Sequence, residues 1–216
     1  PVINQALTEH YEKQMGLRNF TPLVKFTAPQ IGNSTYTYLC DLLRSWLFPK
    51  PQKIVIASTG RAGSTMLYEN LKESVVKQRF PFLSKTFLQH HLCKLAGGCS
   101  YRLEELPQCN APVIKTHDLY YHSPNGPEKY IFIYSHPLDS AQSADQMSKK
   151  DGILWLLRHQ YHLRADGEHD DIFQKDILNY EEQINSWKVK NKNIFCVDYD
   201  TLWNRQDELS QFLGMK

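Results

Sequence analysis

The sequence lacks both a long hydrophobic run and a strong excess of charge of either sign. None of its apolar stretches approaches the roughly 18 residues that a membrane-spanning helix needs. Its 25 basic and 23 acidic side chains leave a net charge of only +2, so neither a nucleic-acid partner nor a membrane surface is expected. We expect a cytoplasmic protein. Because the chain opens on Pro1, a missing native start with a removed signal or anchor stays an open alternative.

Cysteine is scarce, and its spacing excludes the common zinc sites. The five cysteines are Cys40, Cys93, Cys99, Cys109 and Cys196. The cluster of His90, His91 and Cys93 lacks the paired C-x-x-C or H-x(3–5)-H units that bind zinc, so we expect no metal. Cys99 and Cys109 flank a loop and could pair in an oxidising compartment.

A short loop with two glycines joins the first clear strand signal to a helix signal. The run Ile54–Ile56 is apolar and β-branched, and helical spacing of apolar residues begins at Met66. The free N–H groups at a helix start, together with glycines that allow close approach, favour binding of a phosphate or sulfate. The candidate binding residues are Gly60, Arg61, Ala62, Gly63, Ser64, Thr65 and Met66. The alternative is an ordinary strand–helix turn that binds nothing.

The same loop lacks the features of an ATPase loop. That motif reads G-x-x-x-x-G-K-[ST], whereas no lysine precedes Ser64, and Gly60 and Gly63 stand too close together. A magnesium-dependent kinase or nucleotide hydrolase is therefore disfavoured. Arg61 supplies a positively charged guanidinium group instead, which can donate two parallel hydrogen bonds to a phosphate, and Ser64 and Thr65 supply hydroxyl groups.

Strand and helix signals alternate along the rest of the chain. We predict strands at 54–56, 112–117, 130–134 and 194–197, and helices at 8–15, 36–47, from 137 onward, 151–164, 171–188 and 205–213. This alternation predicts an α/β protein with three αβα layers and a mostly parallel central sheet.

One domain is expected over residues 1–216, with an N-terminal helical segment at 1–50. Residues 79–110 are the least regular segment, rich in proline and glycine. They form either a substrate-binding insertion or a plain surface connection.

Three polar clusters follow three predicted strands, and they should meet. They are Arg61–Thr65, Lys115–His117 and Ser135–Ser143. Ligands of open parallel sheets bind at the carboxyl ends of the strands, where these clusters lie. His117 is the candidate base near neutral pH, and the alternative is a structural histidine bonded to a backbone carbonyl.

In order and spacing, these motifs resemble those of the sulfotransferases that use 3′-phosphoadenosine 5′-phosphosulfate (PAPS). Gly60–Thr65 is similar to the 5′-phosphosulfate loop in its arginine form, and Ile114–His117 is similar to the K-[ST]-H segment. Ser135–Asp139, followed by Ser143, resembles the 3′-phosphate segment R-x-P-x-D-x-x-x-S. Two later segments resemble the family's closing strand and helix: Val197–Leu202 and Leu209–Gly214. The resemblance implies the family's P-loop-like fold.

Two departures from the family pattern affect the 3′-phosphate side. Ser135 replaces the arginine that opens that segment, which removes a bidentate phosphate clamp. The sequence also ends at Lys216, before the Gly-rich basic loop that follows in the family. Either His136, Lys149 or Lys150 compensates, or the donor site is weakened. A third alternative is that the sequence is a fragment of a longer protein.

The resemblance implies transfer of a sulfuryl group from PAPS to a hydroxyl or amine of a small-molecule or carbohydrate acceptor, without a metal. His117 would be the general base, with Asp118 as the nearest carboxylate alternative. Arg61 and Lys115 would stabilise the developing charge, and Ser143 would contact the 3′-phosphate with Ser135. The product is adenosine 3′,5′-bisphosphate (PAP). A non-catalytic nucleotide-binding or interaction protein on the same fold is the alternative, ahead of a P-loop kinase.

Overall fold

The computed structural model describes residues 35–49, 52–83, 87–99, 102–120, 128–189 and 191–215. The chain divides into two compact units, residues 1–42 and 43–216. Helix α2 (Thr35–Leu47) confirms the helix expected at 36–47, whereas the helix expected at 8–15 lies outside the described residues. All features below belong to the second unit.

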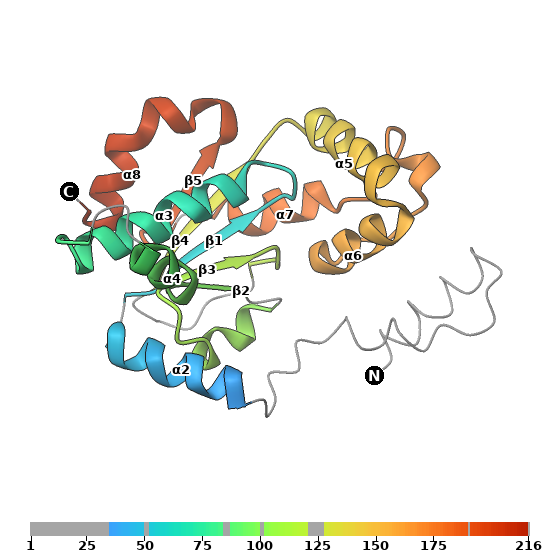
Figure 1. The fold of residues 1–216 in the computed structure, drawn as a ribbon. Helices are drawn as coiled ribbons and strands as arrows, with labels where there is room; N and C mark the ends of the chain where they lie inside the picture. The colour runs from blue at the N-terminus through green and yellow to red at the C-terminus, as the bar shows by residue number, and fades with distance from the viewer. Residues whose placement is uncertain are drawn as a thin grey trace. The chain divides into compact units, whose positions relative to one another are not determined.

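Five parallel strands form one sheet in the order β2-β3-β1-β4-β5 (Figure 1). The strands are β1 (Ile54–Ser58), β2 (Gly97–Cys99), β3 (Val113–Thr116), β4 (Lys129–Tyr134) and β5 (Ile194–Asp198). The central strand β1 pairs in parallel with β3 on one side and β4 on the other. The expected α/β architecture with a parallel sheet between helical layers is therefore confirmed.

Strand β1 is buried along its whole length, which explains the unbroken apolar run from Ile54 to Ala57. Both faces of a parallel sheet are covered, so successive side chains are all apolar rather than alternating. Ile54 and Ile56 belong to the core on one face, and Val55 and Ala57 belong to the core on the other. Burying one such side chain contributes about 1.5–3 kcal/mol. This packing fixes the point at which the chain leaves the sheet after Ser58.

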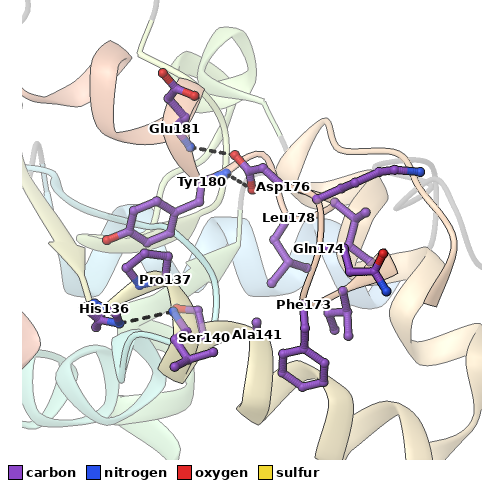
Figure 2. Close-up of a pocket in the computed structure, with 14 residues that line it drawn as sticks. His136, Pro137, Ser140, Ala141, Phe173, Gln174, Asp176, Leu178, Tyr180 and Glu181 are labelled. Carbon is purple, nitrogen blue, oxygen red and sulfur yellow. Dashed lines mark hydrogen bonds between the residues drawn. The ribbon is translucent and has the colours of Figure 1, made fainter. Parts of the chain in front are cut away.

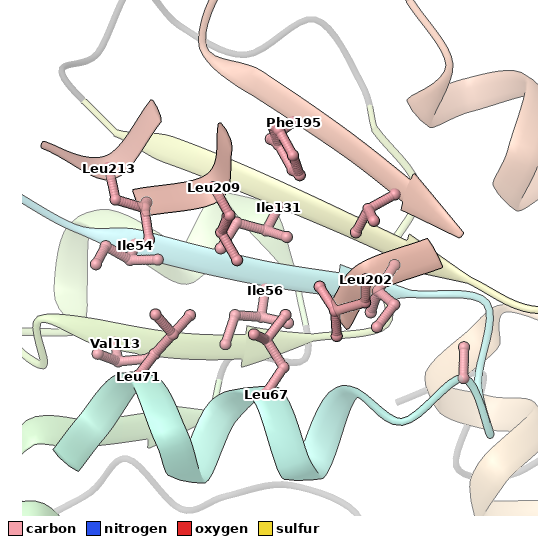
Figure 3. Close-up of a cluster of buried hydrophobic side chains, with 13 residues drawn as sticks. Ile54, Ile56, Leu67, Leu71, Val113, Ile131, Phe195, Leu202, Leu209 and Leu213 are labelled. Carbon is pink, nitrogen blue, oxygen red and sulfur yellow. The ribbon is translucent and has the colours of Figure 1, made fainter. Parts of the chain in front are cut away.

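Helices α3 (Ser64–Arg79) and α8 (Gln206–Leu213) cover the first face of the sheet. Their leucines pack against the isoleucines of β1 and β4 (Figure 3). The short helix η4 (Tyr199–Arg205) adds Leu202 to this core. On the other face, Trp187 of α7 (Tyr180–Trp187) stacks on Phe132 with ring centroids 5.5 Å apart.

Helices α5 (Pro137–Asp151) and α6 (Ile153–Leu163) pack against each other around a separate apolar core (Figure 1). Pro137 opens α5 and Asp139 lies in its first turn, as predicted. The helix expected at 151–164 is shorter, because Gly152 has a φ of +87° and separates the two helices. This corner lets α6 turn back and pack against α5.

The prediction that residues 79–110 are irregular was wrong in part. The segment forms helix α4 (Phe87–Ala96), strand β2 and the short helix η2 (Leu103–Gln108). Strand β2 pairs with β3 at the sheet edge. Its sequence Gly-Gly-Cys has no strand propensity, and pairing with a formed edge is what orders it.

The prediction of one helix at 171–188 was also wrong. The chain forms the short helix η3 (His169–Asp171) and then α7, which begins only at Tyr180. Asn179 adopts a left-handed φ of 54°, and Asp176 caps α7 by accepting hydrogen bonds from Tyr180 N and Glu181 N. An acidic side chain at a helix start favours initiation over continuation.

Two further predictions concern cysteine and the membrane. Cys99 and Cys109 are both free, so the pairing considered for an oxidising compartment is not formed. Within the described ranges, no helix has both the length and the apolar character to cross a membrane.

Candidate functional site

The loop between β1 and α3 adopts a backbone suited to binding an anion. Gly60, Arg61 and Gly63 all have φ values between 57° and 72°, in the left-handed region. Successive N–H groups in such turns form concavities that bind anions, and the N-terminus of α3 follows at Ser64.

Neighbouring rings as well as backbone conformation require glycine at both loop positions. A Cβ atom on Gly60 would lie 2.7 Å from Nε2 of His159. A Cβ atom on Gly63 would collide with the ring of Tyr199. The two glycines therefore let helix α6 and helix η4 approach the loop closely.

Hydrogen bonds bring the three predicted polar clusters together. Lys115 Nζ donates to Thr65 Oγ1 at 2.7 Å, which connects β3 to the start of α3. Arg61 Nε donates to Ser143 Oγ at 2.9 Å, which connects the loop to α5. Residues far apart in the sequence thus share one site at the carboxyl end of the sheet, where parallel-sheet proteins bind ligands.

His117 lies just beyond β3 and contacts the end of β1. Its Nδ1 is 3.1 Å from the carbonyl oxygen of Ser58 and 3.0 Å from Ser58 Oγ. Because a carbonyl oxygen only accepts, we assign the proton to Nδ1, which leaves Nε2 as the basic nitrogen. Ser58 Oγ in turn donates to Ser64 Oγ at 3.0 Å. The backbone contact expected of a structural histidine is thus present, and it leaves Nε2 as the free ring nitrogen.

The histidines of the site are neutral at pH 7. Burial, and secondarily Lys115, lowers the pKa of His117 to about 3. Burial and the guanidinium of Arg102 lower the pKa of His162 to about 4. Burial also holds the pKa of His159 well below its usual range. A neutral imidazole has a ring nitrogen free to accept a proton, but a pKa this low makes it a weaker base than one whose pKa lies near pH 7.

These lowered pKa values predict acid sensitivity. Below pH 6.5 the unfolded chain protonates its histidines while the folded chain excludes those protons, so the free energy of unfolding falls as pH falls toward about 4. Each such histidine contributes a slope of at most about 1.4 kcal/mol per pH unit. Urea unfolding at pH 7.0, 6.0 and 5.0 measures the slope. The variant His162→Gln should have a flatter slope than the wild type, and an equal slope would contradict the assignment.

Helix α6 adds two rings to the site, Trp155 and His159, which the sequence analysis did not identify. The ring of His159 packs edge-on against His117 with centroids 5.7 Å apart and stacks on Trp155 at 4.8 Å. The guanidinium carbon of Arg61 lies 5.6 Å from the centroid of Trp155. The sequence does contain a signal, because Trp155 and His159 are four residues apart on one helix face.

Ser135, just before α5, and Ser140, in α5, form a chain of hydrogen bonds to the loop. Ser135 is 7% exposed, and its hydroxyl lies 2.7 Å from that of Ser140. Ser140 Oγ donates to the carbonyl oxygen of Gly60 at 3.2 Å. Ser135 therefore reaches the loop only through Ser140, whereas Ser143 contacts Arg61 directly.

Two of the three residues expected to compensate for Ser135, His136 and Lys149, have partners of their own. His136 caps α5, since its Nδ1 accepts a hydrogen bond from Leu138 N at 3.3 Å. Lys149 Nζ donates to Asp145 Oδ2 at 2.7 Å. A role for either side chain in binding phosphate stays a prediction.

Asp118 is not available as a general base. Its side chain is 1% exposed. Its carboxylate accepts hydrogen bonds from Arg164 Nε at 2.6 Å and from Leu103 N at 2.9 Å. A carboxylate held by a guanidinium and a backbone amide is an acceptor in a structural network. The role of His117 as the base stays a prediction.

A pocket of about 390 Å³ lies beside this site; its lining includes His136 and Ser140 of the predicted cluster Ser135–Ser143, but neither Ser135 nor Ser143. The start of α5 and residues 172–181 line it, with Phe173 and Leu178 opposite Pro137 and Ala141 (Figure 2). His136 and the carboxylates of Asp176 and Glu181 lie around this apolar lining.

Metal ligands do not gather in this part of the chain. Over the ranges that the structure describes, no group of three or more His, Cys, Asp or Glu side chains is placed to bind a metal ion.

Comparisons with known proteins give distant structural neighbours only. No family model matches the sequence, and no curated protein matches it. Retinol dehydratase in complex with androsterone and the inactive cofactor PAP has a TM-score of 0.45 and 16% identity, over 83% of this chain and 64% of that one. Its complex with retinol and PAP has a TM-score of 0.44 and 16% identity, with 83% and 65% covered.

A sulfotransferase domain from the curacin biosynthetic pathway has a TM-score of 0.33 and 14% identity, over 77% of this chain and 75% of that one. This chain thus spans less than two thirds of the retinol dehydratase chains that it matches. Such TM-scores describe a distant likeness in chain path, and the roles of individual residues do not follow from them.

Proposed function

We propose that this chain transfers a sulfuryl group from PAPS to a hydroxyl or amine group of a small-molecule or carbohydrate acceptor. The observation that supports this best is the junction of β1 and β3. An anion-binding loop, the ammonium of Lys115 and a neutral His117 adjoin there. Backbone N–H groups and a cation can stabilise the charge on a transferred anionic group, and a base beside them can take the proton of the acceptor.

The donor would bind with its 5′-phosphosulfate on Gly60–Met66. The free N–H groups at the start of α3 favour an oxyanion, and Arg61 and Lys115 add positive charge. The 3′-phosphate would lie on the side of Ser143, whose hydroxyl already contacts the Arg61 guanidinium. The segment that begins at Ser135 completes this side in the proposal.

The chemical step would be an in-line displacement at sulfur. An acceptor oxygen or nitrogen forms a bond to sulfur while the bond from sulfur to the 5′-phosphate oxygen breaks. Nε2 of His117 takes the proton that the acceptor loses, and PAP leaves with the electron pair of the broken bond. Lys115 and Arg61 stabilise the charge on the sulfuryl oxygens and on the leaving phosphate.

Isothermal titration with PAP and with ATP, each with and without Mg²⁺, tests this proposal. Binding of PAP that is independent of Mg²⁺ and tighter than binding of ATP is the expected result. Tighter, Mg²⁺-dependent binding of ATP would favour a P-loop kinase instead. Absence of binding by either nucleotide would exclude the proposed donor.

One observation favours a second candidate, a nucleotide-binding protein without catalysis. Ser135 stands where the resemblance expects a phosphate-binding arginine, and its hydroxyl is buried against Ser140. A screen of phenols, amines and sugars with labelled PAPS separates the two functions. Binding of PAP without transfer to any acceptor would support this second candidate.

Replacing Arg61 by alanine should weaken PAP binding about 10- to 100-fold, because a charge-assisted hydrogen bond contributes about 1.5–3 kcal/mol. Titration calorimetry measures the loss. Arg79→Ala is the matched control, since Arg79 lies in the last turn of α3, at the opposite end of that helix from the loop, and donates to Leu47 O. Equal affinities for Arg61→Ala and wild type would show that the loop does not hold the donor.

A further inference from the structure

Two buried polar atoms beside the anion-binding loop lack hydrogen-bond partners among the residues that the structure describes. They are Oγ1 of Thr59 and Nε2 of His159. A buried polar atom without a partner costs about 1–3 kcal/mol, so native proteins rarely retain one without a reason. Thr59 directly precedes Gly60, and His159 approaches Gly60 from α6.

The ring of His159 is held in one orientation. Trp155 stacks on it and His117 packs against it edge-on. Its Nε2 faces the loop, since this atom lies 2.7 Å from the point where a Cβ atom of Gly60 would stand. A residue other than glycine would displace this nitrogen, so the loop and the imidazole are matched in shape.

The surroundings of Nε2 indicate which ligand would satisfy it. Arg61 and Lys115 are the cations around this imidazole, and His117 and His162 are its neutral neighbours. Leu163 Cδ1 also lies close to Gly60, 3.2 Å from the point where a Cβ atom would stand. We assign the ring proton of the neutral His159 to Nε2, and an N–H group in a cationic surrounding satisfies its hydrogen bond best with an anionic oxygen.

We propose that His159 is part of the anion site and that its Nε2–H donates a hydrogen bond to an oxygen of the phosphate or sulfate group held by the loop Gly60–Met66. This role rests on the proposed function only for the identity of the nucleotide. The sequence resemblance assigns no residue of α6 to the donor. His159 would be a binding residue, distinct from the base His117.

Two variants test the proposal on the full chain. His159→Phe keeps an aromatic ring on Trp155 and against His117 but removes the donor. His159→Gln keeps an N–H group near the position of Nε2. Titration with PAP should show about tenfold or weaker binding for the phenylalanine variant, and binding within about threefold of wild type for the glutamine variant.

Thermal unfolding without ligand gives the readout that a structural role would change. An atom with no partner contributes no protein hydrogen bond, so the melting temperature of His159→Phe should equal or exceed that of wild type. A lower melting temperature, or failure to fold, would assign Nε2 a structural role and overturn the proposal. Unchanged PAP affinity in His159→Phe would also overturn it.

Failure of the proposed function remains distinguishable from failure of this inference. If wild type does not bind PAP, the nucleotide assignment is wrong, and pyrophosphate becomes the probe of the loop. Weaker pyrophosphate binding by His159→Phe than by wild type would then support the role of Nε2. Equal binding, or no binding of pyrophosphate by wild type, would overturn it.

Discussion

Replacing His117 by alanine is expected to lower turnover by about 10²–10⁴-fold, which is the usual contribution of a positioned general base. The imidazole is neutral at pH 7, since burial and Lys115 lower its pKa to about 3. Its Nδ1 bonds to the carbonyl oxygen of Ser58, so Nε2 is the nitrogen left to accept the proton. PAP affinity should stay near that of wild type, because other groups hold the phosphates.

The matched variant His117→Asn separates catalysis from support of the fold. Its amide can still donate to the carbonyl oxygen of Ser58, so its stability should be closer to that of wild type, while its turnover should be as low as that of His117→Ala. His117→Lys should not restore activity, since a lysine is mostly protonated at neutral pH. Single-turnover transfer from labelled PAPS to an acceptor found by screening measures the rate. Near wild-type turnover in His117→Ala would leave this histidine a structural role only.

The second large effect is expected for Lys115→Met, which should lower turnover by about 10²–10³-fold. The ammonium group donates to Thr65 Oγ1 at 2.7 Å and so lies at the first turn of α3, beside the loop. In the proposed step it would stabilise charge that develops on the sulfuryl oxygens, and such an effect appears in the chemical step more than in binding. PAP affinity should therefore fall less than turnover.

Lys129→Met is the control for removal of a lysine from the sheet. Lys129 opens β4, pairs in register with Ile54 at the start of β1, and therefore lies at the opposite end of the strands from the site. Its ammonium lies over the ring of Phe212. Turnover should be unchanged in this variant. Equal losses for the two lysine variants would point to a general effect of charge or stability.

Local sequence patterns predicted the centre of the molecule well. The apolar run at β1, the glycine loop and the helical spacing after Ser64 are all present as expected, and β3 and β4 follow at their predicted positions. Such elements form because their own residues match the period and burial of a covered parallel strand or of a helix. The meeting of the polar clusters then follows from the parallel topology alone.

Local patterns failed where pairing or capping across the fold decides the outcome. Strand β2 has a Gly-Gly-Cys sequence that predicts a turn, and it becomes a strand because β3 offers an unpaired edge. The helix predicted at 171–188 begins only at Tyr180, because Asp176 caps it there. Neither event is visible in periodicity, since each depends on a partner or on one side-chain conformation.

The sequence by itself determined the parallel architecture, the glycine loop at Gly60 and Gly63, and the placement of Arg61, Lys115 and His117 at the ends of two strands. Only the tertiary structure decided which other side chains reach that loop. It places Tyr199 against Gly63 and His159 against Gly60, and it directs Ser135 inward to Ser140. The physical reason is that glycine spacing and apolar period are properties of one segment. The approach of α6 and η4 to the loop depends on how separate segments pack at the end of the sheet.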